Sequence, residues 1–290
     1  MDQKFAWPTL GLIIIVYVAW GLLLFIGPWW GVVPVLAVVI ALQSSVQHEV
    51  LHGHPFRSLA KNTAMAWVSL SVVIPYTRFR DTHLAHHYDP LLTDPYEDPE
   101  TNYLDPVVWH GLPRMLQWIL LVNNTLLGRL IIGPLIGIFT FLRMELCGRT
   151  AITTRQWLGH LPAAGIVIGA VYLSPLSVWT YAAAVYLALS ILKLRTYLEH
   201  QASDRASHRS AIVEGGGIFS FLFLNNNLHV VHHMHPKVPW YDLPRLYREN
   251  KAHYLRRNGW YMYPSYGAVF RAYAWRRKDP LAHPIWQPKQ

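Results

Sequence analysis

Four segments of the 290-residue chain are apolar over nearly the length that an α-helix needs to cross a membrane. A hydrocarbon core of roughly 30 Å requires about 20 helical residues. The four segments cover residues 9–27, 31–47, 157–173 and 178–194. Short connections at residues 28–30 and 174–177 join them in two pairs. We therefore predict an all-α integral membrane protein with four transmembrane helices in two hairpins.

The composition agrees with a membrane protein. Hydrophobic residues make up 52% of the chain and charged residues only 14%, whereas about a quarter of the residues of a soluble domain are charged. The single cysteine, Cys147, excludes an internal disulfide. It also excludes a zinc or iron–sulfur site built from several cysteines of one chain.

The distribution of basic residues predicts the topology. None of the 25 Lys and Arg residues lies in the two short connections. Because positively charged segments remain in the cytoplasm, we expect both termini and the central segment there. The net charge of +9 then needs no nucleic acid to explain it.

Two further apolar segments are harder to assign. Residues 64–76 are too short to cross a membrane, and residues 115–142 are interrupted by polar residues, glycine and proline, among them Arg129. We predict interfacial or re-entrant helices for both. No internal repeat or linker divides the chain, so we expect a single domain over residues 1–290.

Many of the 16 histidines are grouped in the sequence. Three groups stand out, and they consist of His48, His52 and His54, of His83, His86 and His87, and of His229, His232 and His233. Histidines three or four residues apart on a helix share one face, and several imidazoles on one face can bind a metal ion. Eight or more nitrogen ligands exceed the four of a structural zinc site, which indicates two metal ions. Imidazole binds Zn, Cu, Fe and Ni alike, so spacing alone does not identify the metal.

The order HxxxH, HxxHH, HxxHH between two transmembrane hairpins resembles the membrane-bound fatty acid desaturase superfamily of non-haem di-iron enzymes, and in particular its short bacterial members. An acidic, proline-rich segment at residues 93–100 follows the second group, as in many bacterial desaturases. Residues 195–200, which end in Glu199 and His200, resemble the family segment that supplies an extra ligand. The resemblance implies two Fe, a di-iron centre that is itself catalytic, O₂ as co-substrate, and a cytoplasmic histidine-box cap at the bacterial inner membrane. The implied metal ligands are His48, His52, His83, His86, His87, His200, His229, His232 and His233.

Other residues are candidates to support these ligands. A metal-bound histidine normally donates its second N–H to a carboxylate or carbonyl group, which fixes the tautomer. An asparagine four residues before the last box reaches the metal through water in some relatives, and His54 and His235 extend two of the boxes. The candidates for second-shell or water-mediated roles are Glu49, His54, Asp89, Asp94, Asp98, Glu199, Asn225 and His235. For any single acid, solvation of a loop is an equally good explanation.

The resemblance implies an O₂-dependent oxidoreductase that introduces a C=C bond into a fatty acyl or lipid-like chain. A hydroxylase or monooxygenase on the same scaffold, and a desaturase of a small secondary metabolite, are alternatives. The chain carries no haem domain, cysteine-ligated cluster or dinucleotide fingerprint. We therefore expect a separate electron donor of the ferredoxin or cytochrome b5 type with its reductase, contact with membrane lipids, and no nucleic acid.

A rival hypothesis comes from the first histidine group. The stretch from His48 to His52 matches HExxH, the signature of zinc proteases in which the glutamate is the general base. This hypothesis leaves both HxxHH groups without a role. A bis-histidine haem protein would need histidines that face one another inside the spans, and a metal carrier would need ionisable residues along them.

Overall fold

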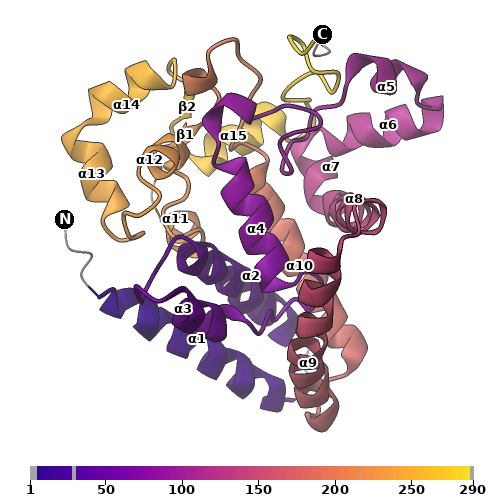
Figure 1. Cartoon of the computed structure of the whole chain (residues 1–290), viewed down its shortest axis with the longest axis vertical. Coiled ribbons are helices and arrows are strands. Elements are labelled where there is room, and N and C mark those ends of the chain that lie inside the picture. Colours follow the sequence, from indigo (N-terminus) through magenta and orange to yellow (C-terminus); the bar gives the residue numbers. More distant parts are fainter. Residues whose placement is uncertain (1–4, 28–30, 216, 288–290) are drawn as a thin grey trace. The chain divides into compact units, whose positions relative to one another are not determined.

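The computed structural model describes residues 5–27, 31–215 and 217–287, without the side chain of Asp89. Helices make up most of the structure, and the described residues contain one short sheet (Figure 1). In the first half of the chain the helices are α1 (Trp7–Phe25), α2 (Val32–Leu51), α3 (Leu59–Ala66), α4 (Tyr76–His86), η1 (Asp89–Leu91), α5 (Pro106–Gly111), α6 (Arg114–Asn123), α7 (Leu126–Ile131) and α8 (Gly133–Cys147). The second half contains α9 (Ala151–Leu173), α10 (Val178–Thr196), η2 (Ala206–His208), β1 (Ile212–Val213), α11 (Ile218–Leu222), α12 (His229–Met234), α13 (Leu243–Glu249), α14 (Lys251–Arg257), β2 (Met262–Tyr263) and α15 (Tyr266–Tyr273).

The chain forms two compact units. The first unit comprises Met1–Asp81 and Pro134–Leu192, and the second comprises Thr82–Gly133 and Lys193–Gln290. Helices α4, α8 and α10 each continue from one unit into the other. The expected single domain over residues 1–290 stays a prediction.

Four helices are long and apolar enough to cross a membrane, namely α1, α2, α9 and α10. They overlap the four predicted spans and confirm the all-α membrane class, although α9 begins at Ala151, six residues before the predicted span. The connection at residues 28–30 lies outside the described residues. Only 28% of the α1 window and 22% of the α9 window is buried inside the protein, against 67% for α2. Exposed apolar faces of this extent are costly in water, so lipid is the solvent that suits α1 and α9. Figure 1 shows α1 alongside α2.

The expected helix at residues 64–76 is wrong for most of that segment. Helix α3 ends at Ala66, α4 begins at Tyr76, and turns and bends lie between them. Pro75 disfavours helical geometry at the residue before it, and Val72 has a positive φ of 54°.

Side chains from the spans pair with the backbone of residues 66–72 within the first unit. Non-helical backbone at membrane depth is tolerated only where the protein satisfies its polar groups. Gln43 Nε2 donates to Val68 O at 3.0 Å, and Gln43 Oε1 accepts from Leu70 N at 3.4 Å. Further donors to this segment are Tyr17 OH to Val68 O at 2.7 Å, Gln47 Nε2 to Ala66 O at 2.8 Å, Tyr181 OH to Leu70 O at 2.6 Å and His160 Nε2 to Val72 O at 3.0 Å. The polar residues of α1, α2, α9 and α10 therefore hold this segment in place.

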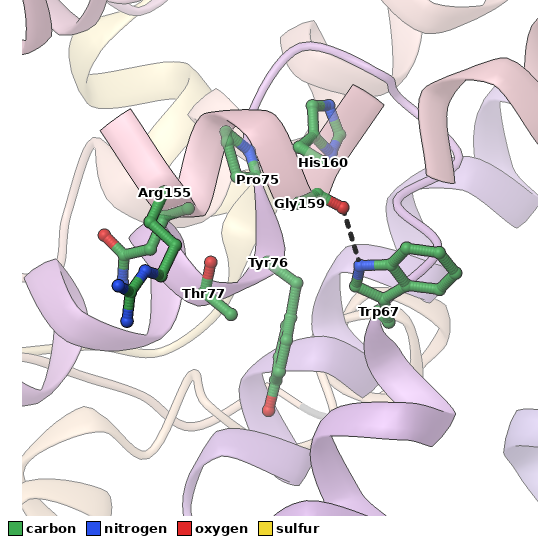
Figure 2. Close-up of a pocket in the computed structure, with 8 residues that line it drawn as sticks. Trp67, Pro75, Tyr76, Thr77, Arg155, Gly159 and His160 are labelled. Carbon is green, nitrogen blue, oxygen red and sulfur yellow. Dashed lines mark hydrogen bonds between the residues drawn. The ribbon is translucent and has the colours of Figure 1, made fainter. Parts of the chain in front are cut away.

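A cavity of about 210 Å³ lies between the ends of this segment and α9 (Figure 2). The indole of Trp67 donates to the carbonyl of Gly159 at 3.1 Å, and Pro75 and His160 also line the cavity. In this contact the segment is the donor and α9 the acceptor, so it is a further link between the start of the segment and α9.

Residues 115–142 are helical, as predicted. They are divided among α6, α7 and α8, and none of these is among the candidate spans found in the described residues. Arg129 is buried, with Nε donating to Asn123 O at 3.0 Å and Nη1 pairing with Asn102. A buried guanidinium that is paired in this way belongs to the interior of the second unit and does not face lipid.

A small apolar core in the second unit supports α12. Ile212 of β1 packs with Val230 and Val231 of α12, and with side chains of α13 and α14. Strand β1 pairs in parallel with β2, with Ile212 opposite Met262. Figure 1 shows α12 beside α13. The apolar face of α12 is therefore buried in this core, and the histidines lie on its other face.

We expect Gln43→Leu to destabilise the protein by about 1–3 kcal/mol, because the buried backbone groups of Val68 and Leu70 lose a partner. Leucine has a similar volume, so packing changes little. Val38→Leu is the control, since it places leucine at an exposed position of the same helix. Thermal unfolding in detergent measures both variants, and equal unfolding temperatures would show that Gln43 does not hold the segment.

Candidate metal centre

Two helices carry most of the grouped histidines in the second unit. His83 and His86 lie in the last turn of α4, and His87 follows directly. His229, His232 and His233 lie on α12, and all three are buried. Since both segments are helical, each presents its histidines on one face, as the spacing predicts.

Four histidines of the second unit converge in a first group. The candidate ligand nitrogens of His86, His200, His229 and His233 all lie within 4.8 Å of one another. His200 Nε2 lies 2.8 Å from His86 Nε2 and 2.9 Å from His229 Nε2. We call these four residues the four-histidine group.

Three histidines form a second group in the same unit. The candidate ligand nitrogens of His83, His87 and His232 also lie within 4.8 Å of one another. His87 Nε2 lies 3.0 Å from His83 Nε2 and 3.1 Å from His232 Nε2. We call these residues the three-histidine group. Helices α4 and α12 each contribute to both groups.

Carboxylates bind the outer nitrogens of the α4 histidines. His86 Nδ1 donates to Asp98 Oδ1 at 2.7 Å, and His83 Nδ1 donates to Glu100 Oε1 at 2.9 Å. Asp98 is fixed in turn, because it accepts from the backbone N–H groups of Thr93 at 2.8 Å and Glu100 at 2.9 Å. The acidic segment after the second histidine box therefore folds back to orient that box.

An amide group and a hydroxyl group lie next to the Nδ1 atoms of His229 and His200. His229 Nδ1 lies 3.2 Å from Asn226 Oδ1, and Asn226 Nδ2 donates to Glu199 Oε1 at 2.9 Å. Glu199 also pairs with Arg195 Nε at 2.9 Å. His200 Nδ1 lies 3.4 Å from Ser210 Oγ. Glu199 thus reaches His229 chiefly through Asn226.

The electrostatics of the four-histidine group favour neutral imidazoles at His200 and His229 and the charged form of His86, which lies next to anionic partners. Burial, followed by the charges of neighbouring histidines, holds the pKa of His200 and His229 well below the ordinary value. Burial also opposes the charged form of His86, but Glu100 and Asp98 raise its pKa to about 9. Burial favours the neutral acid of Glu100, yet the charges of His83 and His86 lower its pKa.

These contacts make the site suitable for metal ions. A neutral imidazole that donates through Nδ1 carries its lone pair on Nε2. The Nε2 atoms of His86, His200 and His229 lie next to one another. Once His86 loses its Nε2 proton, as metal binding requires, their lone pairs meet in one small volume. A bound cation removes this repulsion and balances the surrounding carboxylates. The donor set therefore fits the metal site that the sequence predicts.

The first histidine box belongs to the first unit. Helix α2 continues beyond the predicted end of the span to Leu51, with His52 as its C-cap. The His48 and His52 rings are buried, with centroids 5.0 Å apart. His54 Nε2 lies 3.8 Å from Glu49 Oε1. His48 and His52 thus share a face, as expected for two ligands from one helix.

Some predicted supporting residues lie elsewhere. Asp94 Oδ1 accepts from the N–H groups of Tyr96 and Glu97 at 2.9 and 3.0 Å, so it stabilises a turn. Asn225 donates to Trp240 O at 2.9 Å. His235 packs against Tyr254, with ring centroids 6.0 Å apart. His235 belongs to neither histidine group in the described residues, and the side chain of Asp89 lies outside them.

Sequence reasoning missed Glu100, Asn226 and Ser210 as partners of the histidines. Glu100 lies 17 residues after His83, and Asp98 lies 12 residues after His86. The sequence shows the acidic segment, but spacing along a non-helical segment does not show which acid meets which histidine. Asn226 carries one signal, since it lies three residues before His229, a helical spacing.

A membrane-associated, helical protein with paired clusters of buried histidines is the class that this fold and site define. A model of the family "Fatty acid desaturase" matches residues 27–266, and the chain belongs to that family. This membership makes it an oxidoreductase of the membrane desaturase and oxygenase type. No curated protein matches the chain.

We expect Asp98→Asn to lower metal affinity about 10- to 100-fold, because His86 loses the carboxylate that orients it. Asp94→Asn is the matched control, since it lies in the same acidic segment and an asparagine oxygen still accepts the N–H groups of its turn. Metal titration of the purified variants measures the change. Unchanged affinity in Asp98→Asn would show that the bond to His86 is not a support for a ligand.

Proposed function

We propose that this protein is an O₂-dependent di-iron desaturase that introduces a C=C bond into a fatty acyl or lipid-like chain. The single observation that carries the proposal is the pair of histidine groups shared by α4 and α12, each with its nitrogens within 4.8 Å. Family membership supports the same reaction class. Two irons, when bound, supply the activation of O₂ that the attack on an unactivated C–H bond requires.

The ligand assignment follows from the groups. One iron would be held by the four-histidine group of His86, His200, His229 and His233. The other would be held by the three-histidine group together with His48 and His52 of the first box, as the family resemblance implies. Nine imidazoles without a carboxylate bridge leave the site with positive charge, which Asp98, Glu100 and Glu199 offset.

The net reaction needs a reductant. The substrate gives up two hydrogens, O₂ becomes two molecules of water, and the donor supplies the remaining two electrons with two protons from solvent. A separate ferredoxin or cytochrome b5 with its reductase would fill this role. The basic pairs Arg256–Arg257 and Arg276–Arg277 could attract an acidic donor, although contact with anionic lipid would favour them equally.

The residues of the chain prepare the site for this chemistry. Asp98 and Glu100 hold protons on the Nδ1 atoms of His86 and His83, which keeps the Nε2 lone pairs directed inward. The burial of His86, His229 and His232 limits the access of water, and this limits quenching of a reactive oxidant. We place the site at the cytoplasmic face of a bacterial inner membrane, following the positive-inside distribution of Lys and Arg.

Expression with a redox partner, followed by mass spectrometry of lipids and small metabolites, tests the reaction. A product two mass units lighter than its precursor is expected for desaturation. A product sixteen units heavier would instead show hydroxylation on the same scaffold. One zinc per chain with peptidase activity would favour the HExxH protease, and it would overturn the proposal.

We expect His86→Ala to abolish product formation and to reduce bound iron from two ions per chain to one or none, because the four-histidine group loses a ligand. His110→Ala is the control, since this exposed residue of α5 lies outside both groups. Iron analysis and product analysis are run on the same preparations. Full activity and full iron content in His86→Ala would contradict the ligand assignment.

A further inference from the structure

A segment without helix follows α15 in the second unit and covers residues 274–283. We call this segment the C-terminal strap. Backbone hydrogen bonds hold it against two distant parts of the same unit. Leu104 N donates to Leu281 O at 2.8 Å, and Lys278 N donates to Asn124 O at 3.4 Å. The strap is therefore fixed to the unit at two points.

The side chain of Lys278 is buried among three acceptors. It is only 7% exposed. Its Nζ atom donates to His200 O at 2.8 Å, to Tyr261 OH at 3.0 Å and to Asp279 Oδ2 at 2.6 Å. An ammonium group has three N–H donors, so each donor has an acceptor. Because the carboxylate of Asp279 balances the charge, the buried ammonium group holds the backbone of His200 without an unpaired charge.

His200 differs from the other members of the four-histidine group. His86 lies on α4, and His229 and His233 lie on α12. His200 instead lies in a non-helical segment that follows α10. Helix packing sets the backbone position of the first three residues. The carbonyl group that Lys278 binds thus belongs to the member of the group that most needs tertiary support.

Tyr261 extends this support to the residue two positions before His200. Its hydroxyl group accepts from Lys278 Nζ and donates to Leu198 O at 2.6 Å. The ammonium group also lies 5.5 Å from the centre of the Tyr261 ring. Leu198 and His200 are the two neighbours of Glu199 in the chain, and the backbone of each is held. The direction of the His200 imidazole therefore depends on Lys278 and Tyr261.

A second contact of the strap reaches the acidic segment. His283 is buried, and its Nε2 atom lies 3.2 Å from Thr93 Oγ1. The backbone N–H of Thr93 donates to Asp98, the carboxylate that binds His86. The His283 ring also packs edge-on against Tyr103, with ring centroids 5.0 Å apart. The strap thus contacts the surroundings of two members of the four-histidine group.

We propose that the C-terminal strap positions the four-histidine group, with Lys278 as the positioning residue for His200. The strap lies beyond residues 27–266, which the family model matches, so family membership assigns it no role. The proposal rests on the metal site of the proposed function and is independent of the reaction. Removal of the Lys278 charge alone would favour a bound cation. A loss of metal affinity therefore distinguishes positioning from a charge effect.

Titration of the purified, metal-free full-length chain with Co²⁺ in a non-ionic detergent tests the proposal, with visible absorption as the measure of coordination. Lys278→Met keeps a side chain of similar length without donors, and Lys278→Arg keeps donors and charge. Lys237→Met is the control, because it makes the same substitution at an exposed position of the same unit. His283→Phe keeps a ring against Tyr103 and removes the nitrogen that faces Thr93. Thermal unfolding of the metal-free proteins shows whether each variant folds.

We expect the wild-type protein to bind two Co²⁺ ions per chain. Lys278→Met is expected to bind one of them about tenfold more weakly and with a changed spectrum, and Lys278→Arg is expected to recover most of the affinity. His283→Phe is expected to weaken binding of the same ion, and it decides the result alone where Lys278→Met does not fold.

Unchanged or tighter binding in Lys278→Met, or an equal loss in Lys237→Met, overturns the proposal. Wild-type protein that binds no Co²⁺ overturns the metal site as well. Since no turnover is required, two bound ions in a protein that forms no product would count against the desaturase reaction alone.

Discussion

The hydrogen bond from histidine Nδ1 to an acceptor is the interaction on which the candidate centre depends. The carboxylates of Asp98 and Glu100 accept hydrogen bonds from histidine Nδ1 atoms, and Asn226 Oδ1 lies next to a third Nδ1 atom. In a neutral imidazole, each such bond leaves a lone pair on Nε2. Neutral imidazoles in this tautomer cannot satisfy one another when their Nε2 atoms meet at 2.8–2.9 Å, so a cation must lie between them, either a proton, as the raised pKa of His86 indicates, or a metal ion. The protein has thus placed buried groups in an arrangement that is stable with a cation, and acidic residues around them provide the balancing charge.

The two faces of α12 show how the fold supports this arrangement. Val230 and Val231 are buried in the apolar core around β1, and His229 and His232 lie on the other face. Burial of the valines fixes the rotation of the helix, since a turn of about 100° would move the histidines into the core and the valines into the centre. Helix α4, with His87 directly after it, contributes to both histidine groups as well. Packing forces on two short helices therefore determine the position of six of the seven imidazoles, and His200 is the seventh.

The transmembrane spans could be recognised from hydropathy alone, and their predicted ranges agree with α1, α2, α9 and α10. The histidine faces followed from spacing in the same way, because both signals are local and periodic. The conformation of residues 66–72 could not be predicted from a local pattern. It depends on hydrogen-bond donors that are distant in sequence, such as Gln43 and Tyr181. The sequence shows that these spans contain a few polar residues, but only the tertiary structure shows that they pair with one segment of backbone.

The same distinction applies to the acids near the centre. Asp94 and Asp98 lie four residues apart in one acidic stretch and have equal local chemistry, yet Asp94 stabilises a turn and Asp98 binds His86. That stretch is not helical, so sequence spacing gives no direction to either side chain. The turn at Asp94 nevertheless serves the centre, because it reverses the chain and brings Asp98 and Glu100 back towards α4. Asp94, predicted as a partner of a histidine, therefore stabilises the backbone turn that positions the actual partners, Asp98 and Glu100.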